Sequence, residues 1–135
     1  MAGYSGKPLI QKLGFKPGYR VALSGAPPGF LTELMPLPDG VQMVTRASRS
    51  RLDAVLLFAP DRTSLERELS GWIGRLSPAG MVWVAWPKRA AKVATDLDEN
   101  VVRGIGLAAG VVDVKVCAVN DVWSGLKFVR RLKDR

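Results

Sequence analysis

The sequence contains no histidine, and Cys117 is its only cysteine among 135 residues. Without histidine, Ser-His-Asp and Cys-His nucleophilic catalysis and histidine-ligated zinc are excluded. A single cysteine forms neither an intramolecular disulfide nor a cysteine cluster for a metal. We therefore predict no metal site, and we expect the reducing cytoplasm as the compartment of this protein.

Long apolar runs are also missing. No run approaches the ~18 apolar residues that a membrane helix needs, and residues 1–6 lack the apolar core of a signal peptide. A chain of this length buries enough surface to fold as one unit. We expect a single domain over residues 1–135, with an ordered core from about residue 7 to residue 132, and no association with a membrane.

Acidic residues are few compared with basic ones. The 20 Lys and Arg exceed the 12 Asp and Glu, which gives a formal net charge of +8. This excess favours nucleic acid or an acidic protein as partner in a salt-dependent way, although it also serves solubility. Much of it lies in Arg46, Arg49, Arg51 and the tail 127–135. Aromatic residues make up 7% of the chain, and we recognise no nucleic-acid-binding motif.

Hydrophobic periodicity predicts alternating strands and helices. Apolar or alternating runs predict strands at residues 20–25, 41–45, 52–59, 81–86, 113–119 and 126–132. Helical spacing predicts helices at about residues 7–13, 30–35, 63–76 and 96–109. We expect a capping box at residues 63–66 to begin the third helix, and Thr95 to cap the fourth.

This order predicts the fold class. Strands that alternate with helices, followed by a hairpin, indicate an α/β, three-layer, Rossmann-like sandwich with a mostly parallel sheet and a C-terminal antiparallel hairpin. In such sheets, ligands bind outside the carboxyl ends of the strands. We therefore look for function at that edge.

The first candidate is the loop that follows the first strand. Ser24, Gly25 and Gly29 precede a predicted helix, whose N-terminus has free N–H groups that attract anions. The alternative is a tight turn that simply requires glycine and proline.

The second candidate follows the fourth predicted strand. Lys88, with Arg89 and Lys92, offers positive charge beside Trp86, and Thr95 and Asp96 begin the next helix. We favour a ligand site here over a buried tryptophan with a solvated basic loop.

The third candidate is the C-terminal hairpin, where we expect Trp123 and Lys127 to close over the same site, unless Trp123 folds back on the sheet. For catalysis, the spacing pairs no two carboxylates in a shared cleft, and Cys117 alternates with apolar residues as a core residue does. The sequence therefore identifies no catalytic residue and leaves open whether the protein is an enzyme.

Two resemblances follow from these segments. Six motifs resemble those of a bacterial family of small proteins classified only as a domain of unknown function: Tyr-Ser-Gly (4–6), Leu-Gly-Phe-Lys-Pro-Gly (13–18), Trp-Pro-Lys (86–88), Ala-Thr-Asp-Leu (94–97), Val-Lys-Val-Cys-Ala-Val (114–119) and Trp-Ser-Gly-Leu-Lys (123–127). More distantly, the element order and the phrase Leu-Ser-Pro-Ala-Gly-Met (76–81) resemble the class I S-adenosylmethionine-dependent methyltransferase fold. The first resemblance implies no activity, and the second implies a methyltransferase-like architecture.

The chain departs from the methyltransferase pattern at the cofactor positions. That superfamily has a Gly-x-Gly-x-Gly loop after the first strand, whereas Pro27 and Pro28 here remove two N–H donors. It also has an acidic residue at the end of the second strand, where Thr45 and Arg46 stand here. The stretch from Thr45 to Ala54 is too short for a further helix and strand, so we expect one unit of the fold to be deleted. We do not expect S-adenosylmethionine as cofactor, and the sequence requires none.

Three functional hypotheses remain. The first is a non-catalytic or vestigial methyltransferase-like domain that holds a small anionic or nucleotide-like ligand at the carboxyl edge of the sheet. The second is a basic interaction module that binds nucleic acid or an acidic protein through the arginine loop and the tail. The third is an active methyltransferase with an unusual cofactor geometry.

Overall fold

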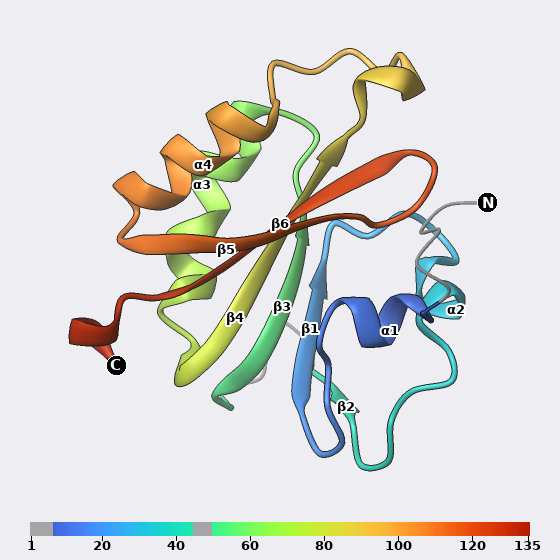
Figure 1. Ribbon diagram of the computed structural model, residues 1–135, viewed down its shortest axis with the longest axis vertical. Coiled ribbons are helices and arrows are strands. Elements are labelled where there is room, and N and C mark those ends of the chain that lie inside the picture. Colours follow the sequence, from blue (N-terminus) through green and yellow to red (C-terminus); the bar gives the residue numbers. More distant parts are fainter. Residues whose placement is uncertain (1–6, 45–49) are drawn as a thin grey trace.

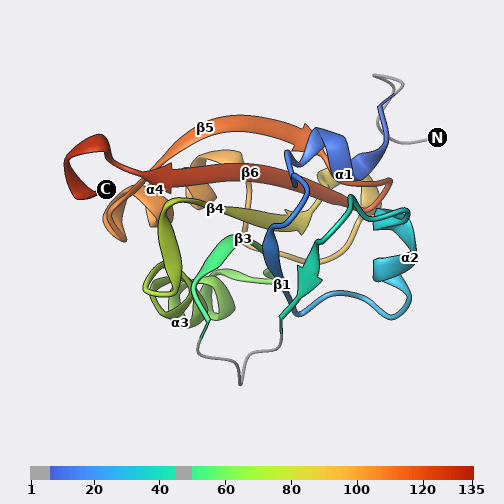
Figure 2. The same ribbon diagram turned by 90° about the horizontal axis from the view of Figure 1, so that it is seen from below.

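The computed structural model describes residues 7–44 and 50–135. A six-stranded sheet lies at the centre, with helices on both faces (Figures 1 and 2). The strands are β1 (Arg20–Ser24), β2 (Gln42–Met43), β3 (Leu52–Phe58), β4 (Leu76–Pro87), β5 (Val111–Ala118) and β6 (Trp123–Arg130). The helices are α1 (Leu9–Lys12), α2 (Phe30–Leu34), α3 (Arg62–Ile73) and α4 (Glu99–Ala108), with short 3-10 turns η1 (Arg89–Ala91) and η2 (Leu132–Asp134).

The strand order is β2-β1-β3-β4-β6-β5. The first four strands in this order, β2, β1, β3 and β4, pair in parallel, whereas β6 is antiparallel to both β4 and β5. The predicted fold class, a mostly parallel sheet with a C-terminal antiparallel hairpin, is confirmed. The carboxyl ends of β1, β3 and β4 lie at one edge, where β6 begins.

Two hydrophobic cores lie on opposite faces of the sheet. One lies under α3 and α4 and includes Leu69 and Val102, and the other lies under α1 and α2 and includes Leu13 and Phe30. Strand β3 supplies residues to both cores because its successive side chains point to opposite faces. Its near-continuous apolar sequence is therefore the pattern of a strand covered on both sides, as predicted.

Several element boundaries differ from the prediction. Helix α3 begins after Asp61, whose carboxylate accepts a hydrogen bond from Ser64 N at 2.8 Å, so the predicted capping box at residues 63–66 is wrong. Strand β4 begins at Leu76, although residues 77–80 read as a turn, because pairing with β3 continues across an irregularity after Leu52. Strand β6 begins at Trp123, three residues earlier than predicted.

The connection between β2 and β3 contains no strand or helix within its described residues, and β1 pairs directly with β3. Thr45 and Arg46, named above as departures from the methyltransferase pattern, lie outside the described residues, as does Arg49. In the part of the chain that the structure describes, no helix is both long and apolar enough to cross a bilayer.

Candidate functional site

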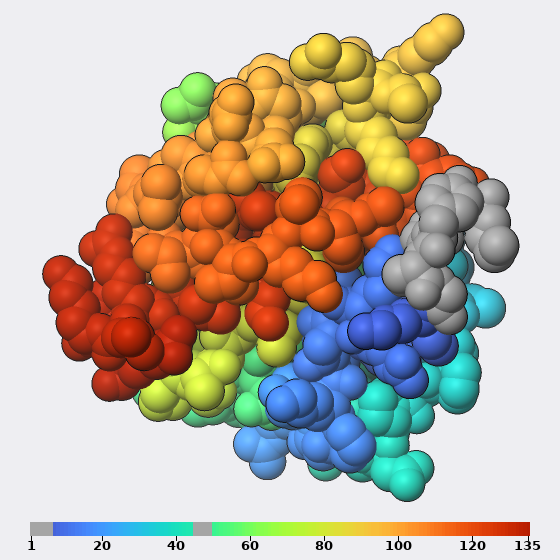
Figure 3. Space-filling model, in the orientation of Figure 1, coloured from blue at the N-terminus to red at the C-terminus, as the bar shows by residue number. Residues whose placement is uncertain are grey.

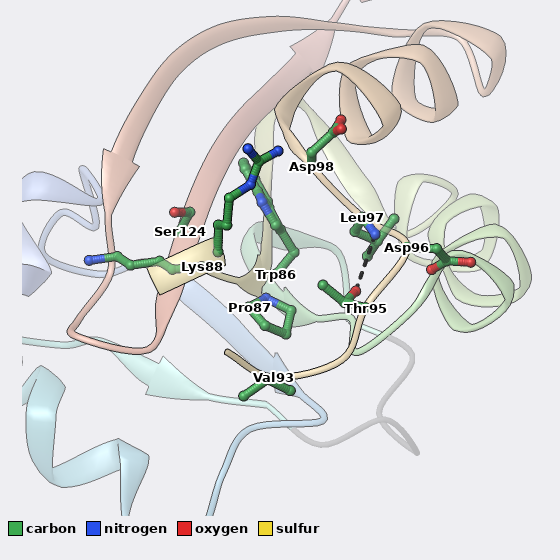
Figure 4. Close-up of a pocket in the computed structure, with 10 residues that line it drawn as sticks. Trp86, Pro87, Lys88, Val93, Thr95, Asp96, Leu97, Asp98 and Ser124 are labelled. Atoms are coloured by element: carbon green, nitrogen blue, oxygen red, sulfur yellow. Dashed lines mark hydrogen bonds between the residues drawn. The ribbon is translucent and has the colours of Figure 1, made fainter. Parts of the chain in front are cut away.

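A cavity of about 450 Å³ opens at the carboxyl end of β4 (Figure 4). We call it the edge cavity. Its lining comes from the end of β4, the following loop, the start of α4 and the start of β6: Trp86, Pro87, Lys88, Arg89, Val93, Thr95, Asp96, Leu97, Asp98 and Ser124. The volume is within the range of small-molecule sites. Four of the predicted site residues, Trp86, Lys88, Thr95 and Asp96, therefore meet in one cavity.

Charges of both signs line the edge cavity. Lys88 and Asp96 extend in opposite directions, and Asp98 lies at the start of α4 (Figure 4). Asp96 Oδ1 accepts a hydrogen bond from Arg62 N, the first residue of α3, at 2.8 Å. Asp98 Oδ1 accepts one from Val101 N at 2.8 Å and caps α4. Each carboxylate thus lies at a helix N-terminus, where the helix dipole stabilises negative charge.

Thr95 does not cap α4, and that prediction is wrong. Its hydroxyl donates to the carbonyl oxygen of Pro60 at 2.8 Å and accepts from Leu97 N at 3.2 Å. These bonds hold the loop against the end of β3, and the helix begins three residues later than predicted, at Glu99. The helix inner face shifts accordingly, and its buried residues are Val102, Ile105 and Gly106.

Trp86 is only 5% exposed and packs in the core under α3 and α4. Little of its indole is therefore open to a stacking ligand, and it serves mainly as the floor of the edge cavity. Ser124 lies beside it because the two residues are directly paired in the β4–β6 ladder. The sequence reasoning missed Ser124, Leu97 and Asp98. Only the N-cap preference for aspartate could have identified Asp98.

The loop after β1 lies at the same edge of the sheet but does not line the edge cavity. Gly25 has φ +67°, and a Cβ there would lie 2.9 Å from the carbonyl oxygen of Phe58, so this glycine allows a close approach of two backbones. Gly29, at φ +79°, precedes α2, which has only five residues. Ser24 is half-buried at the end of β1. Local backbone geometry therefore explains why glycine occupies these positions, and no ligand is needed to explain it.

Trp123 and Lys127 lie on the opposite face of the sheet from the edge cavity. Because β6 begins at Trp123, the side chains of Trp123 and Lys127 share the α1 face, and Ser124 points to the α4 face. The Trp123 ring meets Phe58 edge-on at 5.0 Å between centroids, and Phe58 meets Phe30 at 4.7 Å. The expectation that Trp123 and Lys127 close over the cavity beside Lys88 is not met by this geometry.

Outside the edge cavity, Arg103 on α4 forms ion pairs with Asp113 on β5 and with Glu99 on α4 itself. Arg103 Nε donates to Asp113 Oδ2 at 2.8 Å, and Arg103 Nη2 donates to Glu99 Oε2 at 2.6 Å. The hydrogen bond from Arg103 lowers the pKa of Asp113. Burial raises the pKa of the Cys117 thiol, which lies half-buried on β5. The described residues contain no cluster of three or more Cys, Asp or Glu side chains that could hold a metal ion.

Comparison with known proteins identifies the fold. No family model and no curated protein sequence matches the chain. Among solved structures, magnesium protoporphyrin IX methyltransferase from Synechocystis PCC 6803, with bound SAH, is similar at TM-score 0.63 and 13% identity, over 91% of this chain and 80% of that one. A precorrin-6y C5,15-methyltransferase from Geobacter metallireducens is similar at TM-score 0.60 and 11% identity, over 96% and 94%.

A TehB-like SAM-dependent methyltransferase from Corynebacterium glutamicum is similar at TM-score 0.61 and 9% identity, over 96% of this chain and 89% of that one. At these identities the likeness concerns the fold alone. The chain has the α/β architecture of the S-adenosylmethionine-dependent methyltransferases.

Proposed function

We propose that this protein is a non-catalytic domain of methyltransferase fold that binds a small, anionic, nucleotide-like ligand in the edge cavity. The observation that carries the proposal is the division of charge in a cavity of about 450 Å³, with Lys88 and Arg89 among its cations and Asp96 and Asp98 among its anions. A nucleotide matches both kinds of charge, because its phosphate pairs with the cations and its hydroxyl and amino groups donate hydrogen bonds to the carboxylates.

The residues at the end of β1 do not fit S-adenosylmethionine as it binds in the methyltransferases that the fold resembles. Gly25 packs against the Phe58 carbonyl, Pro27 and Pro28 lack N–H groups, and the rings of Phe30 and Phe58 are in contact at this edge. We therefore propose no transfer step.

The polar groups of the edge cavity also favour binding over catalysis. Both carboxylates accept backbone hydrogen bonds at helix starts, and the Thr95 hydroxyl donates to Pro60. A general base must be free to accept a proton from a substrate, and these groups already serve as caps and loop anchors.

A thermal melt of the purified protein tests the proposal. AMP, ADP, ATP, inorganic phosphate, S-adenosylmethionine and S-adenosylhomocysteine are added separately at fixed salt. We expect a nucleotide at about a hundredfold its Kd to add about 2.7 kcal/mol, which raises Tm by several degrees. The shift should shrink in Lys88→Gln and persist in Lys92→Gln, a control on the same loop that does not line the cavity.

No shift with any nucleotide would overturn the proposal. A shift with S-adenosylmethionine alone that survives Lys88→Gln would instead support an active methyltransferase. Both variants remove one positive charge, so a difference between them reports the edge cavity and not net charge.

A further inference from the structure

Four lysines, Lys12, Lys16, Lys115 and Lys127, lie on the α1 face of the β5–β6 hairpin and the residues next to it, and Lys88 follows the end of β4 between this face and the edge cavity. We call these five lysines the lysine stripe. Lys115 and Lys127 are direct cross-strand partners in the β5–β6 ladder. Like charges directly opposite each other in a sheet are unfavourable, so this pair does not stabilise the fold.

The other three lysines surround this pair. Lys12 Nζ donates to the carbonyl oxygen of Ala118, the last residue of β5, at 2.9 Å, which brings α1 against the hairpin. A Cβ on Gly14 would lie 4.0 Å from Lys127 Nζ, so the loop after α1, which carries Lys16, covers part of β6. Figures 1 and 3 show this face, with α1 in blue beside β5 in orange-red.

Electrostatic effects agree with this placement. The pKa of Lys127 is lowered, first by burial and then by the positive charges of Lys115 and Lys16. At Cys117, burial raises the thiol pKa, and Lys12, Lys115 and Lys88 oppose that rise. The five ammonium groups therefore act on a shared stretch of the sheet surface.

No ion pair joins these five lysines to a carboxylate in the described residues. Within residues 7–44 and 50–135, none of the five ammonium groups has a carboxylate oxygen within 4.0 Å. Of the acidic residues near the hairpin, Asp121 lies in the β5–β6 turn, Glu33 accepts a hydrogen bond from Asn120 Nδ2 in the same turn at 3.0 Å, and Asp113 pairs with Arg103. The charge of the lysine stripe is available to a partner.

The length of the lysine stripe favours a polyanion over a small anion. Lys88 follows Pro87, which pairs with Trp123, and Lys127 lies four residues further along β6. Since Lys88 itself lies level with Val122, the two lysines are five residues apart, which at about 3.3 Å per residue is about 17 Å along the strand, and a single phosphate does not span this distance. Lysine is a flexible point charge that suits contacts with a backbone of repeated charges.

We propose that the lysine stripe binds the phosphodiester backbone of a nucleic acid strand. The choice of nucleic acid over an acidic peptide rests on the proposed function, because Lys88 belongs to both the lysine stripe and the edge cavity. The stripe would thus lead a strand toward a cavity suited to a nucleotide. Binding is electrostatic and independent of base sequence.

Fluorescence anisotropy with labelled mixed-sequence dodecamers tests the proposal. The probes are single-stranded RNA, single-stranded DNA and duplex DNA, each measured with the intact protein over a salt series. The test variant is K115Q/K127Q, which lies outside the edge cavity. The control is K133Q/R135Q, which removes the same charge from the C-terminal tail at the opposite edge of the sheet.

For a single strand that contacts all five lysines, the logarithm of affinity should fall with the logarithm of salt concentration with a slope of about −3.5. K115Q/K127Q should reduce the slope by about 1.4, which at ~0.1 M salt corresponds to about 25-fold weaker binding. K133Q/R135Q should change binding much less. The Tm of K115Q/K127Q should equal or exceed that of the wild type, because the like-charge pair is removed.

Three results would overturn the proposal: no salt-dependent binding of any probe, equal losses in the two double variants, or a loss only in K133Q/R135Q. Polyglutamate or phosphatidylserine vesicles that bind as tightly, and with the same dependence on Lys115 and Lys127, would assign the surface to an acidic protein or a membrane instead. The nucleotide melt is independent of these outcomes. A lysine-dependent oligonucleotide affinity without a mononucleotide shift would refute the edge cavity alone.

Discussion

Two glycines on helix α4 should respond in opposite directions to the same substitution. Gly106 faces the sheet, and a Cβ there would lie 2.1 Å from Cε1 and 2.4 Å from Cζ of Phe128. The Phe128 ring is fully buried and has no room to move away. Gly104 is exposed on the same helix, and a Cβ there would meet nothing within 4 Å.

The magnitudes follow from these contacts. Gly104→Ala should raise the free energy of unfolding by about 0.5–1 kcal/mol, because alanine is the better helix former. Gly106→Ala gains the same helix propensity, but the added methyl group must push α4 away from β6 or force the Phe128 ring out of its preferred rotamer. Overpacking of this kind costs about 1–3 kcal/mol, so this variant should lose stability. For 135 residues, each kcal/mol corresponds to roughly 3–4 °C in Tm.

Urea unfolding followed by tryptophan fluorescence measures both variants. Gly106→Ala is also made in a Phe128→Leu protein, which lacks the ring atoms that a Cβ at residue 106 would meet. There, Gly106→Ala should lower the free energy of unfolding much less than it does in the wild type. Equal stabilities of the Gly104→Ala and Gly106→Ala proteins would refute the packing argument. Additive effects of Gly106→Ala and Phe128→Leu would do the same.

Three further predictions concern the site and its surroundings. Asp98→Ala should lower the free energy of unfolding by about 1 kcal/mol because the N-cap of α4 is lost. Asp98→Asn keeps a side-chain oxygen that can cap the helix, so it should retain most of the wild-type free energy of unfolding, and urea unfolding measures both variants. Because Arg103 lowers the pKa of folded Asp113, this carboxylate contributes stability above its unfolded pKa of about 3.9, and the contribution is lost as pH falls through the lower folded pKa. Asp113→Asn should therefore show a smaller loss of stability on acidification, in urea midpoints measured against pH. Burial raises the Cys117 pKa, so iodoacetamide should modify folded protein more slowly than urea-unfolded protein, and equal rates would contradict that burial.

Much of the fold follows from local patterns in the sequence. Buried strands such as β3 are recognisable because they read as apolar runs closed by proline, and α3 because its apolar residues recur on one face. The alternation of these elements predicts which edge carries the strand ends. This reasoning alone predicts that Trp86, Lys88, Thr95 and Asp96 lie at one edge, and all four line the edge cavity.

The details of the edge cavity depend on contacts between distant residues. Thr95 and Asp98 are both good N-cap residues, and the choice between them is decided by the Pro60 carbonyl, 35 residues from Thr95. Likewise, Ser124 reaches the cavity only through its pairing with Trp86. No local pattern reports such partners.

Strand β6 shows how a small boundary error changes a functional prediction. Read as a loop, residues 120–125 leave Trp123 free to turn toward Lys88. As the first residue of a strand, Trp123 has its orientation fixed, because side chains alternate between the faces. Trp123 and Lys127 then share the α1 face, and Lys127 becomes part of the lysine stripe.

The distribution of charge links the two proposals. At the edge of the sheet, the carboxylates of Asp96 and Asp98 are held at helix starts, where their negative charge is partly balanced by the helix dipoles. The ammonium groups of Lys115 and Lys127 have no such balance and face each other across the ladder. A net positive field therefore extends from the hairpin to Lys88, and an anionic ligand is attracted first to this surface and then to the cavity beside it. For this reason, added salt should lower the affinity of the protein for a polynucleotide far more than its affinity for a mononucleotide.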